Sequence, residues 1–200
     1  MLFDELKKKL EANGFAVSVF AGGEEAAAYL NREIDRKTVG MGGSMTLAEL
    51  GLRESLAQHN VVFSHGFTHC EARETQELAA EAEIYLLSAN AIAADGGEIL
   101  NIDGTGNRVA SSLFGHKKVY FVVGRNKIAP DFHSALHRLR NVAAPKNAQR
   151  LGRKTPCAAR GDRCYDCDSP ERICRALVVH YRPVNQMEME VVLIDQELGY

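Results

Sequence analysis

The sequence lacks any long apolar run, and no stretch of its 200 residues approaches the length of a transmembrane helix. It also lacks an excess of charge of one sign, because the formal net charge is -2 and basic and acidic residues are mixed along the chain. A protein that binds nucleic acid through phosphate contacts carries a basic surface. We therefore expect neither a nucleic-acid partner nor a membrane-spanning segment.

A secretory signal is also missing from the first residues. Leu2, Phe3, Leu6 and Leu10 follow helical spacing among charged residues, which is typical of an amphipathic helix rather than of a signal peptide. We therefore expect a cytoplasmic protein. In that reducing compartment, clustered cysteines more often bind metal or act in catalysis than form disulfides.

The sequence contains no internal repeat, low-complexity tract or linker. Hydrophobic residues make up 46% of the chain, which is enough to bury a sizeable core. We expect residues 1–200 to form a single domain in which residues 155–176 are an embedded cysteine-rich segment.

Strand-like and helix-like patterns alternate through most of the chain. Short apolar runs predict strands at residues 15–20, 38–43, 61–64, 84–88 and 119–124. Amphipathic patterns predict the intervening helices at residues 22–34, 44–52, 71–82, 108–115 and 131–140. This alternation predicts an α/β fold with a mostly parallel sheet flanked by helices.

The alternation ends in the last fifth of the sequence. Residues 175–182 and 187–195 are both rich in β-forming residues. We expect them to form a hairpin, or two strands that extend the sheet, after the cysteine-rich loop.

Four of the five cysteines lie in one short segment, TPCAARGDRCYDCDSPERIC. They are Cys157, Cys164, Cys167 and Cys174, with the spacing Cys-x6-Cys-x2-Cys-x6-Cys. A tight turn at Cys164 and Cys167 can aim two sulfurs at one ion, and the six-residue arms are long enough to bring the other two around it. The segment therefore predicts a metal site, with two disulfides as the alternative.

The ligand type alone does not identify the metal. Four thiolates suit an iron–sulfur cluster and a structural zinc ion equally well. The length of the arms and the absence of histidine from the segment favour a 4Fe-4S cluster, and zinc remains the alternative. The fifth cysteine, Cys70, is far from this segment and is expected to be a small buried hydrophobe.

Two glycine-rich segments follow predicted strands. The first offers the backbone N–H groups and hydroxyls of Gly42, Gly43, Ser44 and Thr46 to an anion. The second, ADGGEILNIDGTGNR, contains Asp95, Gly96, Gly97, Asp103, Gly104, Thr105 and Asn107 between a strand and a helix. Ligands of open α/β sheets bind outside the carboxyl ends of the strands, so both segments are candidate anion sites. Tight turns and helix caps are the alternative explanation.

Three side chains are the candidates for chemistry at these loops. Asp95 and Asp103 are the acid/base candidates, because each lies in a glycine-rich loop at an expected strand end. Lys127 is expected to contact the anion. Asp103 could equally be the N-cap of the helix that begins near Gly106.

Two pairs of histidines have a four-residue spacing that would place both imidazoles on one helical face. They are His65 with His69, beside Cys70, and His133 with His137. A loop at the first pair and a solvated basic face at the second explain the spacing more simply, so we assign neither pair to a metal.

The segments GMGGSMTLAELG, SANAIAADGGEILNIDGTGNRVASSLFGHKKVYFVVGRNKI and EVVLIDQELGY resemble the LUD domain family, which includes lactate utilisation protein C. The resemblance covers essentially the whole chain and implies the fold of the ribose-5-phosphate isomerase and CoA transferase superfamily. The more familiar LUD proteins act with iron–sulfur partner subunits to oxidise L-lactate to pyruvate. Typical members of that subgroup lack the four-cysteine segment, so this chain resembles a shorter, cysteine-bearing branch.

The residues from Ser88 to Lys127 also resemble methylthioribose-1-phosphate isomerase, but with departures. Asn90 stands where those enzymes carry a catalytic aspartate, and the stretch from Asp95 to Thr105 is one residue longer. Isomerase chemistry is therefore not implied. Glu98 is the nearest counterpart of the glutamate nucleophile of CoA transferases.

These patterns favour an oxidoreductase component of small carboxylate metabolism, related to lactate utilisation. It would bind a small anionic metabolite and an iron–sulfur cluster, and iron–sulfur redox subunits or further copies of the chain would be its protein partners. Two alternatives stay open: a redox or sensory iron–sulfur module without catalysis, and a sugar-phosphate or acyl-binding protein with a structural zinc.

Overall fold

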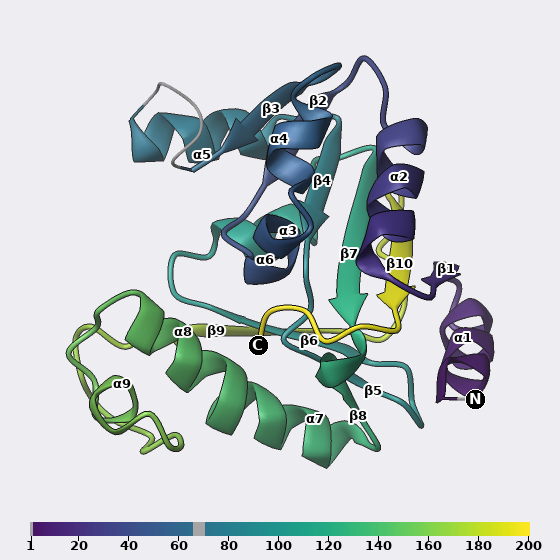
Figure 1. Cartoon of the computed structure of the whole chain (residues 1–200). Helices are drawn as coiled ribbons and strands as arrows, with labels where there is room; N and C mark the ends of the chain where they lie inside the picture. The colour runs from purple at the N-terminus through teal and green to yellow at the C-terminus, as the bar shows by residue number, and fades with distance from the viewer. Residues whose placement is uncertain (1, 66–70) are drawn as a thin grey trace.

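The computed structural model describes residues 2–65 and 71–200, and its strands form two sheets (Figure 1). The expectations for His69 and Cys70 lie outside the described residues. From edge to edge, the larger sheet contains β1 (Ala16–Phe20), β10 (Glu188–Ile194), β7 (Lys118–Gly124), β4 (Ile84–Leu87), β2 (Thr38–Met41) and β3 (Val61–Ser64). Every neighbouring pair in this sheet is parallel, which confirms the predicted α/β fold.

A smaller sheet contains, in order, β8 (Ile128–Ala129), β5 (Ala91–Ala93), β6 (Ile99–Asp103) and β9 (Ala176–His180). Its β5–β8 pair is parallel and its other two pairs are antiparallel. The helices are α1 (Leu2–Ala12), α2 (Gly23–Glu33), α3 (Met45–Glu49), α4 (Leu52–Leu56), α5 (Ala72–Ala80), α6 (Asn107–Ser111), the 3-10 turn η1 (Arg125–Lys127), α7 (Phe132–Arg138), the π-helical turn η2 (Leu139–Ala143), α8 (Ala144–Arg150) and α9 (Pro156–Arg160).

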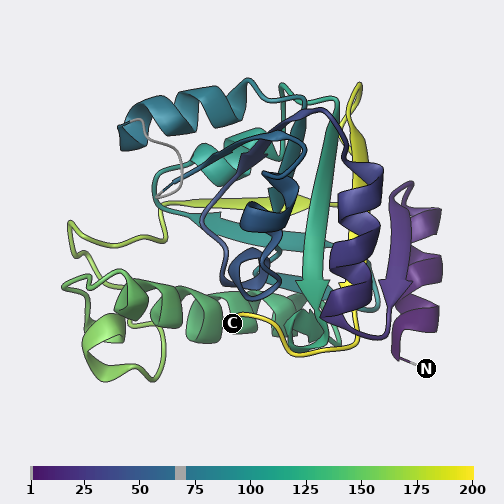
Figure 2. The same ribbon diagram turned by 45° about the horizontal axis from the view of Figure 1, so that its top comes forward.

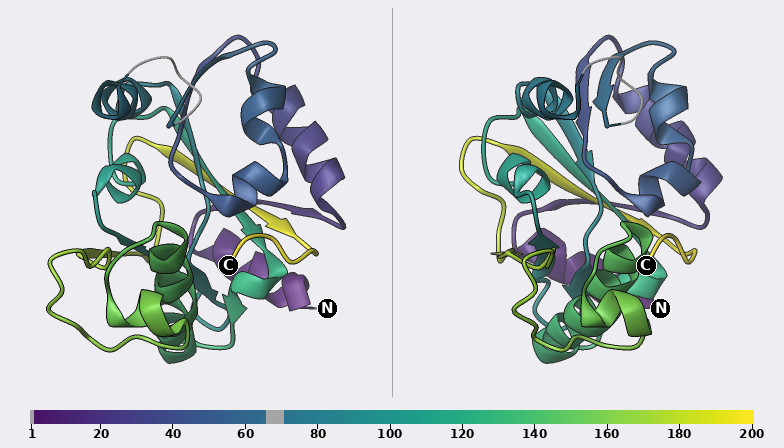
Figure 3. Two further views of the ribbon diagram at one scale, coloured as in Figure 1. Left: turned by 60° about the vertical axis from the view of Figure 1, so that its left-hand side comes forward. Right: turned by 90° about the vertical axis from the view of Figure 1, so that its left-hand side faces the viewer.

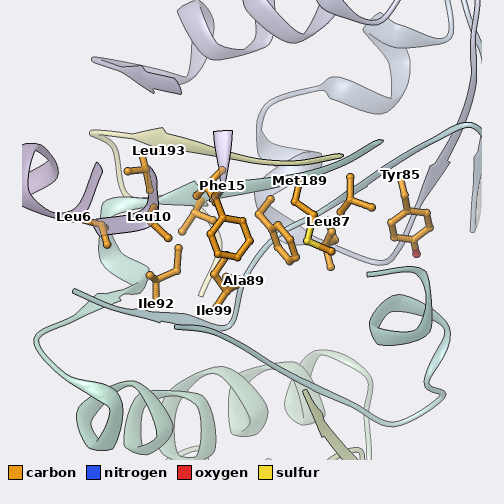
Figure 4. Packing of buried hydrophobic residues seen from close by; sticks show 14 of the residues in the cluster. Leu6, Leu10, Phe15, Tyr85, Leu87, Ala89, Ile92, Ile99, Met189 and Leu193 are labelled. Atoms are coloured by element: carbon orange, nitrogen blue, oxygen red, sulfur yellow. The ribbon is translucent and has the colours of Figure 1, made fainter. Parts of the chain in front are cut away.

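The elements stack in layers around three apolar clusters. Helices α2, α3 and α4 cover one face of the larger sheet. The other face packs on the smaller sheet and on α1, and Figure 4 shows the side chains that fill this interface. The outer face of the smaller sheet is covered by α7 and η2, within the continuous green helical segment along the bottom of Figure 2.

Strand β7 explains why the larger sheet could be predicted. Val119, Phe121 and Val123 point into the cluster between the sheets, whereas Tyr120 and Val122 point into the cluster under α2 to α4. A strand that is covered on both faces needs apolar residues at every position, because successive side chains alternate between the faces. The apolar run VYFVVG has this composition.

Helix α1 confirms the amphipathic pattern of the first residues, because Phe3, Leu6 and Leu10 are buried in the cluster between the sheets. Within residues 2–65 and 71–200, no helix is both long and apolar enough to cross a membrane.

The smaller sheet was not predicted. Strand β6 lies inside the glycine-rich segment that was interpreted as one loop, and its residues Ile99 and Leu100 are fully buried. The glycines and aspartates on either side hid the strand, because they are typical of turns. In the structure they form the turns at its two ends.

The two C-terminal strands are confirmed, but of the two arrangements expected for them the hairpin is not formed. Strand β9 joins the smaller sheet beside β6, while β10 inserts between β1 and β7 in the larger sheet. The different burial of the two strands explains why they join different sheets. Val191, Val192, Leu193 and Ile194 are fully buried, which an interior parallel strand requires, whereas Leu177 of the edge strand β9 is 47% exposed.

Candidate functional site

A pocket of about 740 Å3 lies at the carboxyl ends of the parallel strands. Met41 ends β2, Ser88 follows β4, and Lys127 ends the turn after β7. Ligands of open α/β sheets bind at this edge. The predicted residues that line the pocket are Gly43, Ser44, Asp103, Gly104, Thr105, Asn107 and Lys127.

Other predicted residues do not line the pocket. Asp95, Gly96 and Gly97 lie in the turn between β5 and β6, where the Gly96 carbonyl accepts a hydrogen bond of 2.8 Å from the Asn13 side chain beside α1. Asp95 and Asp103 therefore do not lie in one loop, because β6 separates them.

Gly42 and Thr46 lie behind the pocket wall. A Cβ atom at Gly42 would lie 3.0 Å from the Arg108 side chain and from the Tyr85 hydroxyl, so a larger residue here would require these side chains to shift. Thr46 is fully buried and touches Lys127.

The charges of the pocket favour an anion. Its lining contains six basic residues and two acidic ones. The basic residues are Arg108, Lys127, Arg150, Arg153, Arg172 and Arg175, and the acidic ones are Asp103 and Glu171. A concave surface lined by one sign of charge concentrates ligands of the opposite sign. Sequence reasoning missed the arginines because they come from separate segments and form no basic run.

Arg108 connects the segments of the pocket floor through hydrogen bonds. One terminal nitrogen of its guanidinium donates to the Ser88 carbonyl at 3.1 Å and to Asn101 Oδ1 at 3.0 Å. The other donates to Asn90 Oδ1 at 3.2 Å and to the Ile102 carbonyl at 2.9 Å. This cation ties the β4–β5 connection to β6 and still adds its positive charge to the pocket. The Asn90 side chain is thus an acceptor for an arginine.

Asp103 caps the loop that enters α6. Its carboxylate accepts hydrogen bonds from the backbone N–H groups of Thr105 and Gly106, both at 3.1 Å, and of Val109, at 3.3 Å. The N-cap position of α6 is Gly106, so Asp103 is not the N-cap residue itself, but its carboxylate satisfies N–H groups of the preceding loop and of the first helical turn. Asp103 also faces the pocket, so its acid/base role stays a prediction.

Ser44 has a similar local role at α3, because its hydroxyl accepts from the backbone N–H of Leu47 at 3.4 Å. Helices α3 and α6 contain five residues each. Because both helices are short, we attribute the preference for anions to the side-chain charges.

Lys127 is the most unusual group of the pocket. Only 4% of the residue is exposed, and its Nζ donates to Thr46 Oγ1 at 2.7 Å and to Ser88 Oγ at 2.9 Å. Burial and the positive charges of Arg138 and Arg108 lower the pKa of Lys127 to about 7, although the negative charge of Glu49 opposes the shift. The amine is therefore partly uncharged at neutral pH.

The segment 198–200 crosses one side of the site. The Leu198 carbonyl accepts from Thr46 Oγ1 at 3.2 Å, and the Gly199 carbonyl accepts from Asn126 Nδ2 at 3.1 Å. Tyr200 lines the pocket, where its hydroxyl accepts from Arg150 Nε at 2.7 Å. The sequence of residues 198–200 does not predict these contacts, because they depend on the position of β10 in the larger sheet.

The four cysteines of the predicted metal segment line one small cavity of about 20 Å3. The segment folds as α9 and a loop that lie beside α8, and Figure 3 shows them at the edge of the molecule. Ala144, Arg172 and Ile173 line both this cavity and the large pocket. The cysteine cavity and the anion pocket therefore share a wall.

The donors of this cavity suit a metal, but their spacing is not that of a formed site. All four thiols are free of disulfides, and Cys164 Sγ accepts from the backbone N–H of Asp166 at 3.3 Å. In the described part of the chain, however, no three His, Cys, Asp or Glu side chains are close enough to hold one ion. Metal binding would require the loop to close around the ion.

The histidine pairs are not grouped as ligands either. His133 and His137 line a shallow depression beside Cys164, and His65 lies at the large pocket. None belongs to a metal-binding group among the residues that the structure describes.

Comparisons with known proteins agree with the fold. A crystal structure of a DUF162 family protein from Deinococcus radiodurans is similar to this chain, with a TM-score of 0.56, 12% sequence identity, and 96% of each chain covered. A search of curated proteins gives no match. The sequence profile of the LUD domain matches residues 3–194, and the chain therefore belongs to the LUD domain family.

Proposed function

We propose that this LUD domain protein binds a small carboxylate in its large pocket and acts as a component of lactate-utilisation-like oxidation. The observation that carries the proposal is the excess of basic side chains around a pocket at the carboxyl ends of the parallel strands. A 2-hydroxy or 2-oxo acid offers the negative charge that these side chains attract. Membership of the LUD domain family supports this substrate class.

The cysteine segment is the second part of the proposal. Cys157, Cys164, Cys167 and Cys174 would hold the 4Fe-4S cluster, which when bound supplies one-electron transfer. Oxidation of a 2-hydroxy acid to a 2-oxo acid releases two electrons and two protons. The reaction therefore needs an electron acceptor, for which we propose a partner iron–sulfur protein. The wall that the cysteine cavity shares with the large pocket supports a cluster close to the proposed substrate site.

Elemental analysis with an absorption spectrum tests the cluster. Anaerobically purified protein should contain about four irons per chain and absorb broadly in the visible range. The variant Cys164→Ser should lose both signals, whereas Cys70→Ser, outside the segment, should keep them. Colourless protein without iron would refute the electron-transfer part of the proposal.

A structural zinc is the second candidate, and the size of the cavity favours it. A cavity of about 20 Å3 has room for about one water-sized sphere. Binding of a single zinc ion therefore requires less movement of the thiols than binding of a 4Fe-4S cubane does. One zinc per chain without colour would identify the segment as a clip on the pocket wall and would favour a sugar-phosphate or acyl-binding protein.

Calorimetric titration with L-lactate, pyruvate and inorganic phosphate tests the pocket. We expect a carboxylate to bind to the wild type and affinity to fall about 10- to 100-fold in Arg175→Ala, the range expected for loss of one charged hydrogen bond. Arg36→Ala, on the surface away from the pocket lining, is the control and should bind as the wild type does. Equal binding by both variants would remove Arg175 from the site, and no binding of any carboxylate would refute the substrate class.

A further inference from the structure

The hydrogen bonds of Lys127 suit a neutral amine. The Thr46 hydroxyl donates its hydrogen to the Leu198 carbonyl at 3.2 Å, and the Ser88 hydroxyl donates to the Ala89 carbonyl at 3.4 Å. In this arrangement both oxygens accept from Lys127, whose Nζ uses two N–H bonds on them. A neutral amine has only two N–H bonds, so these contacts satisfy it completely and leave its lone pair unused.

The charges around Lys127 also favour the neutral amine. The hydrogen-bond partners that residues 2–65 and 71–200 give to its Nζ are the hydroxyls of Thr46 and Ser88, not carboxylates. The charged groups that influence it are Arg138 and Arg108, which oppose protonation, and the more weakly acting Glu49, which favours it. A buried lysine near other cations is the usual way in which proteins prepare an amine as a nucleophile.

We infer that Lys127 forms an imine with a carbonyl compound that carries an anionic group, of the 2-oxo acid class. The inference rests on the proposed function of the pocket and goes beyond the anion contact expected for this lysine. Lys127 lines the pocket at the end of β7, and the volume of about 740 Å3 admits a small oxo acid beside the amine.

The reaction balances without any oxidant. The lone pair of Lys127 Nζ forms a bond to the carbonyl carbon as the C–O π bond breaks. The two amine hydrogens then leave with the carbonyl oxygen as water, and a C=N bond remains. Thr46 and Ser88 hold the nitrogen in place for the attack, and the basic residues of the pocket hold the carboxylate.

Reductive trapping tests the imine. Purified full-length protein is incubated with pyruvate and sodium borohydride, and the modified residue is located by peptide mass mapping. We expect one dominant adduct, on Lys127, in the wild type. It should be absent from Lys127→Arg and Lys127→Met and retained in Lys146→Met, which replaces an exposed lysine of α8. The mapping of wild-type protein decides the question even if a Lys127 variant fails to fold.

Parallel calorimetry with pyruvate, without borohydride, separates the two proposals. Binding of pyruvate without an adduct on Lys127 overturns the imine but leaves the carboxylate pocket intact. Adducts spread evenly over many lysines overturn it as well. The absence of both binding and adduct overturns the imine together with the proposed function.

Discussion

Replacing Lys127 by methionine should change how the stability of the fold depends on pH. The folded pKa of about 7 lies well below the value of about 10.4 of an unfolded lysine. Between these values the unfolded chain binds more protons than the folded one, so the lysine makes the fold more stable as pH rises. Methionine has a similar volume and no titrating group, so its variant lacks this contribution.

The magnitude follows from the two pKa values. The contribution changes by about 1.4 kcal/mol per pH unit, and less near pH 7, where the folded amine is half protonated. From pH 7 to pH 9, the wild type should gain about 2 kcal/mol of unfolding free energy relative to Lys127→Met.

Urea unfolding of both proteins at pH 7, 8 and 9 measures this gain. Subtracting the unfolding free energy of the variant from that of the wild type at each pH removes the contributions of all other groups that titrate in this range. Lys117→Met, at an exposed lysine, is the control and should differ from the wild type by a constant amount. A constant difference between wild type and Lys127→Met from pH 7 to pH 9 would show that the buried amine is not desolvated as described.

Three further predictions concern the pocket floor and the cysteine segment. Arg108→Met removes the donor of four partly buried hydrogen bonds and should lower the unfolding free energy by about 3 kcal/mol or more in urea titrations. An unchanged midpoint would contradict this role of Arg108. Gly42→Ala places a Cβ within 3.0 Å of two side chains and should destabilise by about 1–3 kcal/mol, whereas Gly43→Ala, with nothing within 4 Å, should have little effect. A chelator should lower the thermal midpoint of metal-loaded wild type but not of Cys164→Ser, and equal midpoints with and without chelator in the wild type would argue against a stabilising metal.

The sequence predicted those features that depend on local pattern. The apolar run of β7 and the helical spacing at the start of the chain each reflect burial that is visible residue by residue. Strand β6 was missed because turn-forming residues on both sides outweigh its short apolar core. The grouping of the four cysteines around one cavity could be predicted because they are close in sequence, whereas their binding of a metal stays a prediction.

The environment of Lys127 could not be predicted in the same way. Its partners Thr46, Ser88 and Leu198 lie on separate segments that meet only in the folded protein. The sequence does not show whether a lysine is buried, and the lowered pKa of Lys127 depends on its burial. The arginines of the pocket were missed for the same reason.

The position of β10 has a consequence for synthesis of the chain on the ribosome. Strand β1 has a single neighbour in its sheet, and that neighbour is β10. The two strands are far apart in sequence, at residues 16–20 and 188–194. The ribosome therefore completes β10 on the order of ten seconds or more after β1 at typical elongation rates. During that time β1 has no native partner, and both it and the edge of β7 are open to contacts with other chains. The nascent protein should therefore need protection by chaperones at this edge until its final strand emerges.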